Sequence, residues 1–425
     1  MNKFDYIWNF NKKFKHNYFE EIYSESLKNL QKNSSWKIFF PTTICFLSIK
    51  YKKKVFIEKI TGASIINRIP LKIMIPISSN KISKRHLDKS YILKNIKKFD
   101  QISINLIDQK AANSIEFLNH FNNQILNSKE LVNRDSIMKN SSISFNWKKK
   151  DLKEVKIVKL KSHHLLFLNI NTIFINNFLK NKKIIWQSLP KYKENFKFYF
   201  NILEKKKYYK GFTDNYNYKI NLKNINYLNK NKIKNFTKIK LKQFKIKEIK
   251  KLSSEQSKWP IFFPSSVGMI GSIDKKKQIN IMPCGSTTVV NRHPFQIATA
   301  ISHLDNNIRY RKRFSLKKIL TNKKISLGIP YSNSKILNMI NYMGNVSKYD
   351  FKNKINNTTF NKTITKYGPI LNDFPFTYGC VLTKKIKFET HTLLIFSVKK
   401  VYYFKNFNKK KLLWNGLFKV SKKLK

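Results

Sequence analysis

The chain has 425 residues, of which 41% are hydrophobic and 14% aromatic, enough apolar material for two or three domain cores. Its formal net charge is +63, a value that usually suggests binding to nucleic acid or to an anionic membrane. Only 7 of the 86 basic residues are arginines, however, and lysine lacks the planar fork that reads phosphates and bases. The charge is therefore weak evidence for nucleic acid as the primary partner.

Cysteine usage and hydropathy exclude several other classes of protein. The three cysteines, Cys45, Cys284 and Cys380, have no spacing typical of a disulfide framework or a structural zinc site. No apolar run reaches the roughly 18 residues of a membrane-spanning helix, and the N-terminus lacks the apolar core of a secretory signal. We therefore expect a soluble cytoplasmic protein without a metal site and without a membrane partner.

In chain order, most of the predicted elements are short apolar strands bounded by turn residues. They cover residues 38–49, 71–77 and 102–106, and then 261–273, 295–301, 325–329 and 391–403. Two helices are predicted from apolar side chains at helical spacing, at residues 115–125 and 336–343. Many short strands with one or two helices favour a mainly β (α+β) fold built from closed barrels, which have no exposed sheet edges.

Several motifs occur twice in the same order. WKIFFPTTI at residues 36–44 returns as WPIFFPSSV at 259–267. Further pairs are Asn67-Arg68 with Asn291-Arg292, His163 with His391, and Trp186 with Trp414. Compositional bias would repeat Lys and Asn runs rather than Trp, Pro and His, so we predict an internal duplication.

The duplication divides the chain into four parts. They are an N-terminal extension (1–34), a first copy (35–194), a connector rich in Lys and Asn (195–250) and a second copy (251–425). The connector is expected to be solvated, with a hairpin around Gly211 or a short helix near Leu241 to Leu252.

The motifs of the second copy resemble a known family. They are Phe263 to Val267, Asn280 to Pro283, Thr288 to Pro294, Asp350-Phe351, Cys380 and His391 to Leu394. In order and spacing they resemble the flavin reductase-like proteins with an FMN-binding split barrel, the group that includes flavoredoxin. The resemblance covers most of residues 259–418 and, more faintly, 36–190. It implies two tandem six-stranded split β-barrels that form a pseudo-dimer within one chain.

The resemblance also implies a function. It indicates a flavin-dependent oxidoreductase, an NAD(P)H:flavin reductase in which hydride passes from the nicotinamide to FMN, with FAD as the alternative flavin. The chain has no G-x-G-x-x-G fingerprint, so NADH or NADPH would bind transiently against the flavin. The alternative is a non-catalytic flavin- or tetrapyrrole-binding protein, because fold does not determine activity. Ser397 stands where many relatives carry glycine.

The candidate flavin site is centred on residues 284–288, whose backbone N–H groups and small hydroxyls can approach a phosphate and a ring edge. Alternatively, Gly285 marks a β-bulge and the hydroxyls satisfy strand ends. The resemblance adds Arg309 as the phosphate-binding cation, with Arg311 or Arg313 as substitutes. The predicted cofactor-binding residues are Met282, Pro283, Cys284, Gly285, Ser286, Thr287, Thr288, Val289, Asn291, Ser302, His303 and Arg309.

Two histidines and one cysteine have open interpretations. By resemblance, His391 is the catalytic candidate, facing the flavin and the nicotinamide; otherwise it is a partly buried imidazole bonded to a carbonyl. His303 either reaches the flavin or caps the preceding strand. Cys284 is expected to be a packed side chain rather than a redox thiol.

The two copies differ at three positions where glycine allows close backbone approach. The pairs are Gly268 against Cys45, Gly271 against Ser48, and Gly328 against Asn105. We therefore expect the second copy to bind flavin and the site built on residues 61–67 to bind weakly or not at all. On this view, Gly62→Val should barely alter the flavin stoichiometry.

Overall fold

The fold is described from a computed structural model of the chain. The described residues are 19–23, 42–51, 54–79, 89–107, 136–138, 141–176, 186–187, 241–244, 265–273, 278–291, 294–303, 314–330, 343, 362–371, 374, 376–404 and 414–415. The helix predicted at 115–125, nearly all of that at 336–343 and the hairpin at Gly211 lie outside these ranges.

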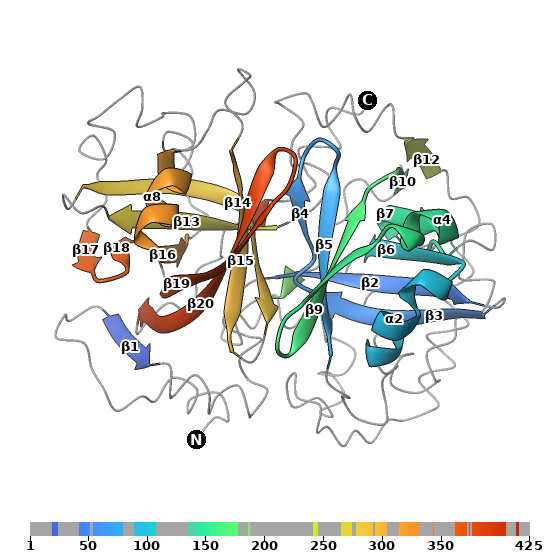
Figure 1. Ribbon diagram of the computed structural model, residues 1–425, viewed down its shortest axis with the longest axis horizontal. Helices are drawn as coiled ribbons and strands as arrows, with labels where there is room; N and C mark the ends of the chain where they lie inside the picture. The colour runs from blue at the N-terminus through green and yellow to red at the C-terminus, as the bar shows by residue number, and fades with distance from the viewer. Residues whose placement is uncertain are drawn as a thin grey trace, which may run out of the picture.

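The C-terminal half contains a closed barrel of six antiparallel strands (Figure 1). The barrel runs in the order β20-β15-β14-β13-β16-β19 and closes through the pairing of β19 with β20. Its strands are β13 (Ser265–Ile273), β14 (Ile279–Asn291), β15 (Gln296–Ser302), β16 (Lys324–Ile329), β19 (Phe376–Lys387) and β20 (His391–Phe404). Closure pairs the backbone groups that an open sheet would leave exposed at its edges.

Further elements surround this barrel. Helix α8 (Phe314–Asn322) buries Leu316 and Ile319 in the barrel core, and a hairpin of β17 (Lys362–Thr365) and β18 (Gly368–Leu371) lies beside β16. Two short strands, β1 (Phe19–Tyr23) and β21 (Trp414–Asn415), pair with β20 and β13. The predicted N-terminal extension thus adds a strand to the C-terminal half. Within the described ranges, no helix is long and apolar enough to cross a membrane.

The N-terminal half is also mainly β. One sheet has the order β11-β2-β6-β7-β10-β12 with β3 on β2, and the other has the order β4-β5-β9-β8. The strands are β2 (Thr42–Tyr51), β3 (Lys54–Thr61), β4 (Ser64–Asn67), β5 (Lys72–Ser78), β6 (Gln101–Ile107), β7 (Ser141–Lys148), β8 (Lys156–Lys159), β9 (His163–Asn169), β10 (Thr172–Asn176), β11 (Trp186–Gln187) and β12 (Leu241–Phe244). The helices are α2 (Lys89–Asn95), η2 (Ile96–Lys98) and α4 (Lys149–Lys153).

One element of the predicted connector differs from expectation. The prediction of a helix near Leu241 to Leu252 is wrong for its first four residues. Residues 241–244 instead form strand β12, antiparallel to β10. The edge of β10 offers backbone donors and acceptors, and pairing with them satisfies groups that a single helical turn would leave open. This strand lies inside the segment that we expected to be solvated.

The two halves meet through the strands at the centre of the molecule (Figure 1). A hydrophobic cluster joins Ile66, Met74, Leu165 and Phe167 of the N-terminal half to side chains of the other half. The latter are Val290, Ala298, Ala300, Ile386, Phe388, Leu393 and Ile395. Strands β5, β9, β15 and β20 therefore face a core on one side and the opposite half on the other, which explains their nearly continuous apolar sequences.

Two buried asparagines tie the halves together with the same set of hydrogen bonds. Asn67 Oδ1 accepts hydrogen bonds from the backbone N–H (2.9 Å) and the hydroxyl (2.7 Å) of Thr390. Asn291 Oδ1 accepts the equivalent pair from Ser162, at 3.0 and 2.9 Å. Each asparagine amide also donates to a proline carbonyl three residues on, Pro70 or Pro294, at 2.9 Å. We call these two sets of bonds the asparagine clasps.

The glycines that distinguish the second half have a packing role. A Cβ on Gly328 would lie 2.5 Å from the Phe374 ring, and one on Gly271 would lie 2.8 Å from Pro369. A Cβ on Gly268 would lie 2.7 Å from Leu327. These neighbours belong to the same half: Pro369 and Phe374 lie outside the six barrel strands, and Leu327 is on the adjacent strand β16. The glycines therefore make room for packing within the C-terminal half.

The corresponding positions of the first half carry a buried polar network instead. Asn105 donates to Ser48 Oγ at 2.7 Å and accepts from the Met138 backbone N–H at 3.1 Å. Ser48 donates in turn to the carbonyl of Ser136. The side chains of Ser48 and Asn105 therefore hold the segment 136–138 against the sheet. This role is a physical alternative to the lost ligand contacts that we inferred from sequence.

The asparagine clasps generate a stability prediction. Asn67→Ala should lower the free energy of unfolding by about 2–3 kcal/mol, because it leaves the buried N–H and hydroxyl of Thr390 without an acceptor. Asn291→Ala should have a similar effect through Ser162. Denaturant titration of the full chain measures both. The exposed control Lys362→Ala should change stability by no more than about 0.5 kcal/mol, and an equally small effect of Asn67→Ala would refute a stabilising clasp.

Gly62 provides a second prediction, which concerns stability and leaves the predicted flavin stoichiometry of Gly62→Val untested. Its φ is +86°, and an added Cβ would lie 2.5 Å from the Val289 carbonyl oxygen in the opposite half. Gly62→Ala should therefore lower the free energy of unfolding by about 2 kcal/mol or more, and Gly62→Val should lower it as well. Thermal unfolding measures the loss. An unchanged midpoint for Gly62→Ala would show that the β4 and β14 backbones can separate at little cost.

Candidate functional site

The middle of β14, the end of β15 and the start of β20 bring several predicted site residues together. Ser302, the last residue of β15, pairs with His391, the first residue of β20. Cys284 on β14 reaches β15 from the other side, where its Sγ lies 2.8 Å from Thr299 Oγ1 and 3.4 Å from the Ala300 carbonyl oxygen. Tertiary structure thus places residues more than 100 positions apart at one end of the barrel.

Within residues 284–288, the side chains fall into two groups. Cys284, Thr287 and Thr288 are buried, and the Thr287 hydroxyl donates to the Cys284 carbonyl at 3.2 Å. Gly285 and Ser286 are half-buried. An approaching phosphate or ring edge would therefore meet Gly285 and Ser286 first, while the threonines fix the strand that carries them.

The other predicted cofactor residues of β14 divide in the same way. Met282 and Pro283 are half-buried. Val289 and Asn291 are buried toward the N-terminal half, and the Asn291 amide has its oxygen and nitrogen bonded to Ser162 and Pro294. These bonds give Asn291 a structural role in a clasp. A flavin contact by Asn291 stays a prediction that would require those bonds to change.

Arg309, the predicted phosphate-binding cation, lies outside the described residues, as do Arg311 and Arg313. The described strand β15 ends at Ser302, and helix α8 begins at Phe314. In the sequence, the three arginines thus fall between β15 and α8.

The hydrogen bonds around His391 assign its tautomer. Thr390 donates its single hydroxyl hydrogen to Asn67 Oδ1, so Thr390 Oγ1 acts as the acceptor of its 2.8 Å contact with His391 Nδ1. His391 Nδ1 therefore carries a hydrogen, and Nε2 is the acceptor nitrogen of the neutral ring. The imidazole is 8% exposed. A role of His391 in hydride transfer stays a prediction. The structure does show that Asn67 of the N-terminal half holds the Thr390 hydroxyl, which in turn contacts the His391 ring.

His303 is more accessible than His391. Its backbone N–H donates to the Thr390 carbonyl at 3.2 Å, and its Nδ1 lies 3.1 Å from Thr392 Oγ1. Burial and, secondarily, the charge of Lys387 lower the pKa of His303, against a smaller opposing effect of a backbone hydrogen bond at Glu389. The ring is half-buried beside the strand end. It both anchors the β15 end and remains close to the candidate site.

Sequence reasoning missed the residues of the N-terminal half that complete this region. Gly62 accepts a hydrogen bond from Thr288 Oγ1 at its carbonyl oxygen, at 3.0 Å. Asn67 and Ser162 form the clasps described above. A signal was available, since both motifs repeat an asparagine and a hydroxyl-His pair, Ser162-His163 and Thr390-His391. The similarity of the two motifs does not by itself reveal that the asparagine of one copy contacts the hydroxyl residue of the other.

Metal and thiol chemistry receive no support from the described part of the chain. Within it, no group of three or more His, Cys, Asp or Glu side chains is arranged to hold a metal ion. Cys45, Cys284 and Cys380 are free thiols with buried side chains, and burial raises the pKa of Cys45 and of Cys380. A raised pKa disfavours the reactive thiolate.

The environment of His303 generates a pH prediction. Because the folded pKa lies below the usual 6.5, the unfolded chain binds more protons. The stability that neutral His303 contributes is thus fully present above pH 6.5 and is lost as the pH falls through the folded pKa. An NMR titration of the imidazole should give a pKa below 6.5, and Lys387→Gln should raise it. A value above 6.5 in the unmodified protein would contradict this environment.

The closed barrel and this strand-end site coincide with a match to a protein family. Residues 261–419 match the model of the flavin reductase like domain. The match begins just before β13, includes all six barrel strands and ends beyond β21. A search of the curated proteins found no match.

Several solved structures are similar to this chain. Flavoredoxin from Methanosarcina acetivorans has 18% sequence identity over 35% of this chain and 74% of its own, with a TM-score of 0.30. The FMN-binding protein from Thermus thermophilus has 17% identity over 37% of this chain and 83% of its own, with a TM-score of 0.31. The styrene monooxygenase flavin reductase from Pseudomonas putida S12 has 11% identity, coverages of 37% and 89%, and a TM-score of 0.29.

The family match and the closed six-stranded barrel fall on the same residues. The part of the chain that is similar to the flavin reductase like domain, residues 261–419, is therefore the part that contains the closed barrel.

Proposed function

We propose that the protein is a flavin-dependent oxidoreductase that reduces FMN with NADH or NADPH, with FAD as the alternative flavin. The observation that carries this proposal is the match of residues 261–419 to the flavin reductase like domain. NAD(P)H as the donor follows from the sequence resemblance. Bound flavin and nicotinamide would supply the chemistry, the transfer of one hydride from the nicotinamide to the flavin.

The donor groups at the end of the barrel fit a flavin. Gly285 and Ser286 are half-buried on β14, so a backbone without a side chain and a small hydroxyl both remain partly accessible. Met282 and Pro283 add half-buried apolar surface on the same strand. An arginine in the segment after β15, for which Arg309 is the candidate, would neutralise the phosphate. Together these groups would bind and orient a molecule with an anionic end and an apolar ring.

The histidines would contribute by position and by hydrogen bonding. The tautomer of His391 presents Nε2 as an acceptor, and the bond from Nδ1 to Thr390 fixes the ring. The lowered pKa of His303 favours its neutral ring, which would limit charge repulsion with an arginine bound to the same phosphate. The chain would thus hold both reactants at the strand ends and exclude water, and proximity and orientation would provide most of its catalytic contribution.

We also propose that the two halves are diverged copies of one barrel that form a pseudo-dimer. The matching asparagine clasps support this, because the same atoms of Asn67 and Asn291 bond to the residue before a histidine in the opposite half. Strand order adds support. If β3 with β4, β7 with β8 and β9 with β10 are each counted as one interrupted strand, the N-terminal half has the pairings of the C-terminal barrel.

One flavin per chain is the stoichiometry that we propose. In the N-terminal half the residues that follow β3, Gly62, Ala63 and Ser64, are all buried, whereas Gly285 and Ser286 are half-buried. The Gly62 carbonyl oxygen is also bonded to Thr288. This packing leaves the first half less backbone that a second flavin could reach.

Absorption spectroscopy and turnover test the proposal. The purified full chain should bind one FMN or FAD and oxidise NADH or NADPH when flavin is supplied. Arg309→Ala should weaken flavin binding about ten- to a hundredfold, because it removes a charge-assisted contact to the phosphate. Gly285→Val should weaken binding by at least as much by obstructing the backbone. Lys362→Ala, an exposed lysine on β17, is the matched control and should have no effect.

Four outcomes would alter the proposal. A colourless protein that oxidises neither nucleotide would exclude a flavin reductase. Bound flavin without hydride transfer would favour a non-catalytic flavin-binding protein, and a bound tetrapyrrole would favour that alternative ligand. Two flavins per chain would show that the first half is also competent.

A further inference from the structure

Glu389 adds a negative charge to one of the two asparagine clasps. It lies in the turn between β19 and β20, where its Oε2 accepts a hydrogen bond from Asn67 Nδ2 at 2.8 Å. Lys72, the first residue of β5, holds the same carboxylate, with its Nζ 2.8 Å from Oε1 and 3.2 Å from Oε2. Burial alone would raise the pKa of Glu389, but the hydrogen bond from Lys72 and the charges of Lys72 and Lys156 lower it. The carboxyl group is therefore ionised at neutral pH.

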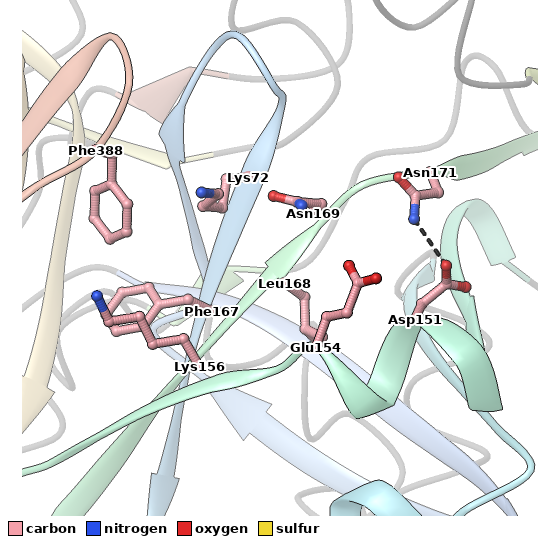
Figure 2. A pocket seen from close by; sticks show the side chains of 9 residues that line it. All are labelled: Lys72, Asp151, Glu154, Lys156, Phe167, Leu168, Asn169, Asn171 and Phe388. Atoms are coloured by element: carbon pink, nitrogen blue, oxygen red, sulfur yellow. Dashed lines mark hydrogen bonds between the residues drawn. The ribbon is translucent and has the colours of Figure 1, made fainter.

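The ion pair of Lys72 and Glu389 is partly accessible. The two side chains are 14% and 49% exposed, and Lys72 lines a pocket of about 80 Å³ at the junction of the halves (Figure 2). Phe388 of the C-terminal half lies against it, with Lys72 Nζ 5.1 Å from the ring centroid. In Figure 2 the side-chain oxygen of Asn169 points toward Lys72, although this buried oxygen has no hydrogen-bond partner in the described structure. A partly exposed carboxylate is thus attached to a buried clasp.

From Glu389 the hydrogen bonds continue to His391. Asn67 turns its nitrogen to Glu389 and to the Pro70 carbonyl, so its oxygen faces Thr390. That oxygen takes the hydroxyl hydrogen of Thr390 at 2.7 Å, which leaves Thr390 Oγ1 to accept from His391 Nδ1 at 2.8 Å. Each bond fixes the direction of the next, because amides and hydroxyls have distinct donors and acceptors. We call this chain of bonds, from Glu389 to His391, the Glu389 relay.

The turn between β8 and β9 in the N-terminal half is the counterpart of this turn. The backbone N–H of Phe388 donates to the carbonyl three residues on at 2.9 Å, and that of Leu160 does the same at the same distance. The residue that follows is Glu389 in one turn and Lys161 in the other. Lys161 therefore occupies the place of Glu389 with the opposite charge.

The clasp at this second turn has no carboxylate. Asn291 Nδ2 donates to a proline carbonyl and, among the described residues, to no carboxylate. Gln296 pairs with Asn291 where Lys72 pairs with the first asparagine. The Ser162 hydroxyl still links Asn291 to His163, at 2.9 Å on each side. The two histidines are thus held by equivalent bonds that differ in the charge at the far end.

We propose that Glu389 is a positioning residue for His391 and keeps the ring in its Nδ1–H tautomer. It acts through Asn67 and Thr390. The carboxylate favours the amide orientation in which the Asn67 oxygen faces Thr390, and a charge-assisted bond is roughly twice as strong as a neutral one. Nε2 of His391 then keeps its lone pair. His163 is held by uncharged groups, so its tautomer is less strongly fixed. Any effect on catalysis rests on the proposed function, whereas the tautomer itself does not.

Nitrogen-15 NMR of the full chain with labelled histidine tests the relay, because the two ring nitrogens of a neutral imidazole give distinct signals. Spectra are recorded about two pH units above the usual pKa of histidine, where neutral rings predominate. His391 should show the Nδ1–H tautomer, and His391→Gln identifies its signals. Glu389→Gln keeps the shape of the side chain and removes its charge. It should raise the ratio of the Nε2–H to the Nδ1–H tautomer about threefold or more.

A reciprocal variant and a control complete the NMR experiment. Lys161→Glu places a carboxylate at the matching position and should move His163 toward its Nδ1–H tautomer by a similar factor. Residues 161 and 389 are both exposed, so both variants should fold. Glu154→Gln, which removes an exposed carboxylate on another turn, should change neither histidine.

Turnover separates this proposal from the proposed function. With flavin and NADH or NADPH, Glu389→Gln should lower kcat about three- to tenfold and leave KM nearly unchanged, because only the His391 ring is affected. An unmodified protein that reduces no flavin defeats the proposed function, and the NMR spectra then decide the relay alone. The relay is refuted if unmodified His391 is in the Nε2–H tautomer, or if Glu389→Gln leaves its tautomer ratio unchanged. A changed ratio with an unchanged kcat would refute the catalytic effect.

Discussion

The association of the two halves through buried asparagine clasps is the constraint on which the rest of the structure depends. Asn67 and Asn291 each satisfy a backbone N–H and a hydroxyl of the opposite half, at the rim of a shared apolar cluster. Apolar contact supplies most of the driving force and is not directional. The clasps supply direction, because a small shift between the halves would leave four buried donors without acceptors.

The candidate flavin site shares its strand with this junction. Residues 284–286 face the strand end, whereas Thr288, Val289 and Asn291 on the same strand contact the N-terminal half. Strand β14 therefore links the proposed flavin site physically to the association of the halves. His391 shows the same link, since the hydroxyl that holds its ring is itself held by Asn67.

The two halves satisfy similar sheets with different covering segments. In the C-terminal half, Gly271 and Gly328 make room for Pro369 and Phe374. In the N-terminal half, Ser48 and Asn105 bond to residues 136–138. A glycine at one position and a polar side chain at its counterpart are thus two solutions to covering a strand. Such differences between the halves are therefore explained by local packing, without a difference in ligand contacts.

The sequence by itself determined the β-rich character, most of the strand positions and the similarity of residues 261–419 to the flavin reductase like domain. Strands such as β5, β6, β16 and β20 were predictable because alternation, apolar runs and turn residues are local properties. The partners of Asn67, the burial of His391, the strand at residues 241–244 and the pocket beside Asn169 were decided only by tertiary structure. Each depends on a group far away in the chain. A hydrogen-bond partner, an open strand edge or an unused acceptor leaves no periodic signal in the segment that meets it.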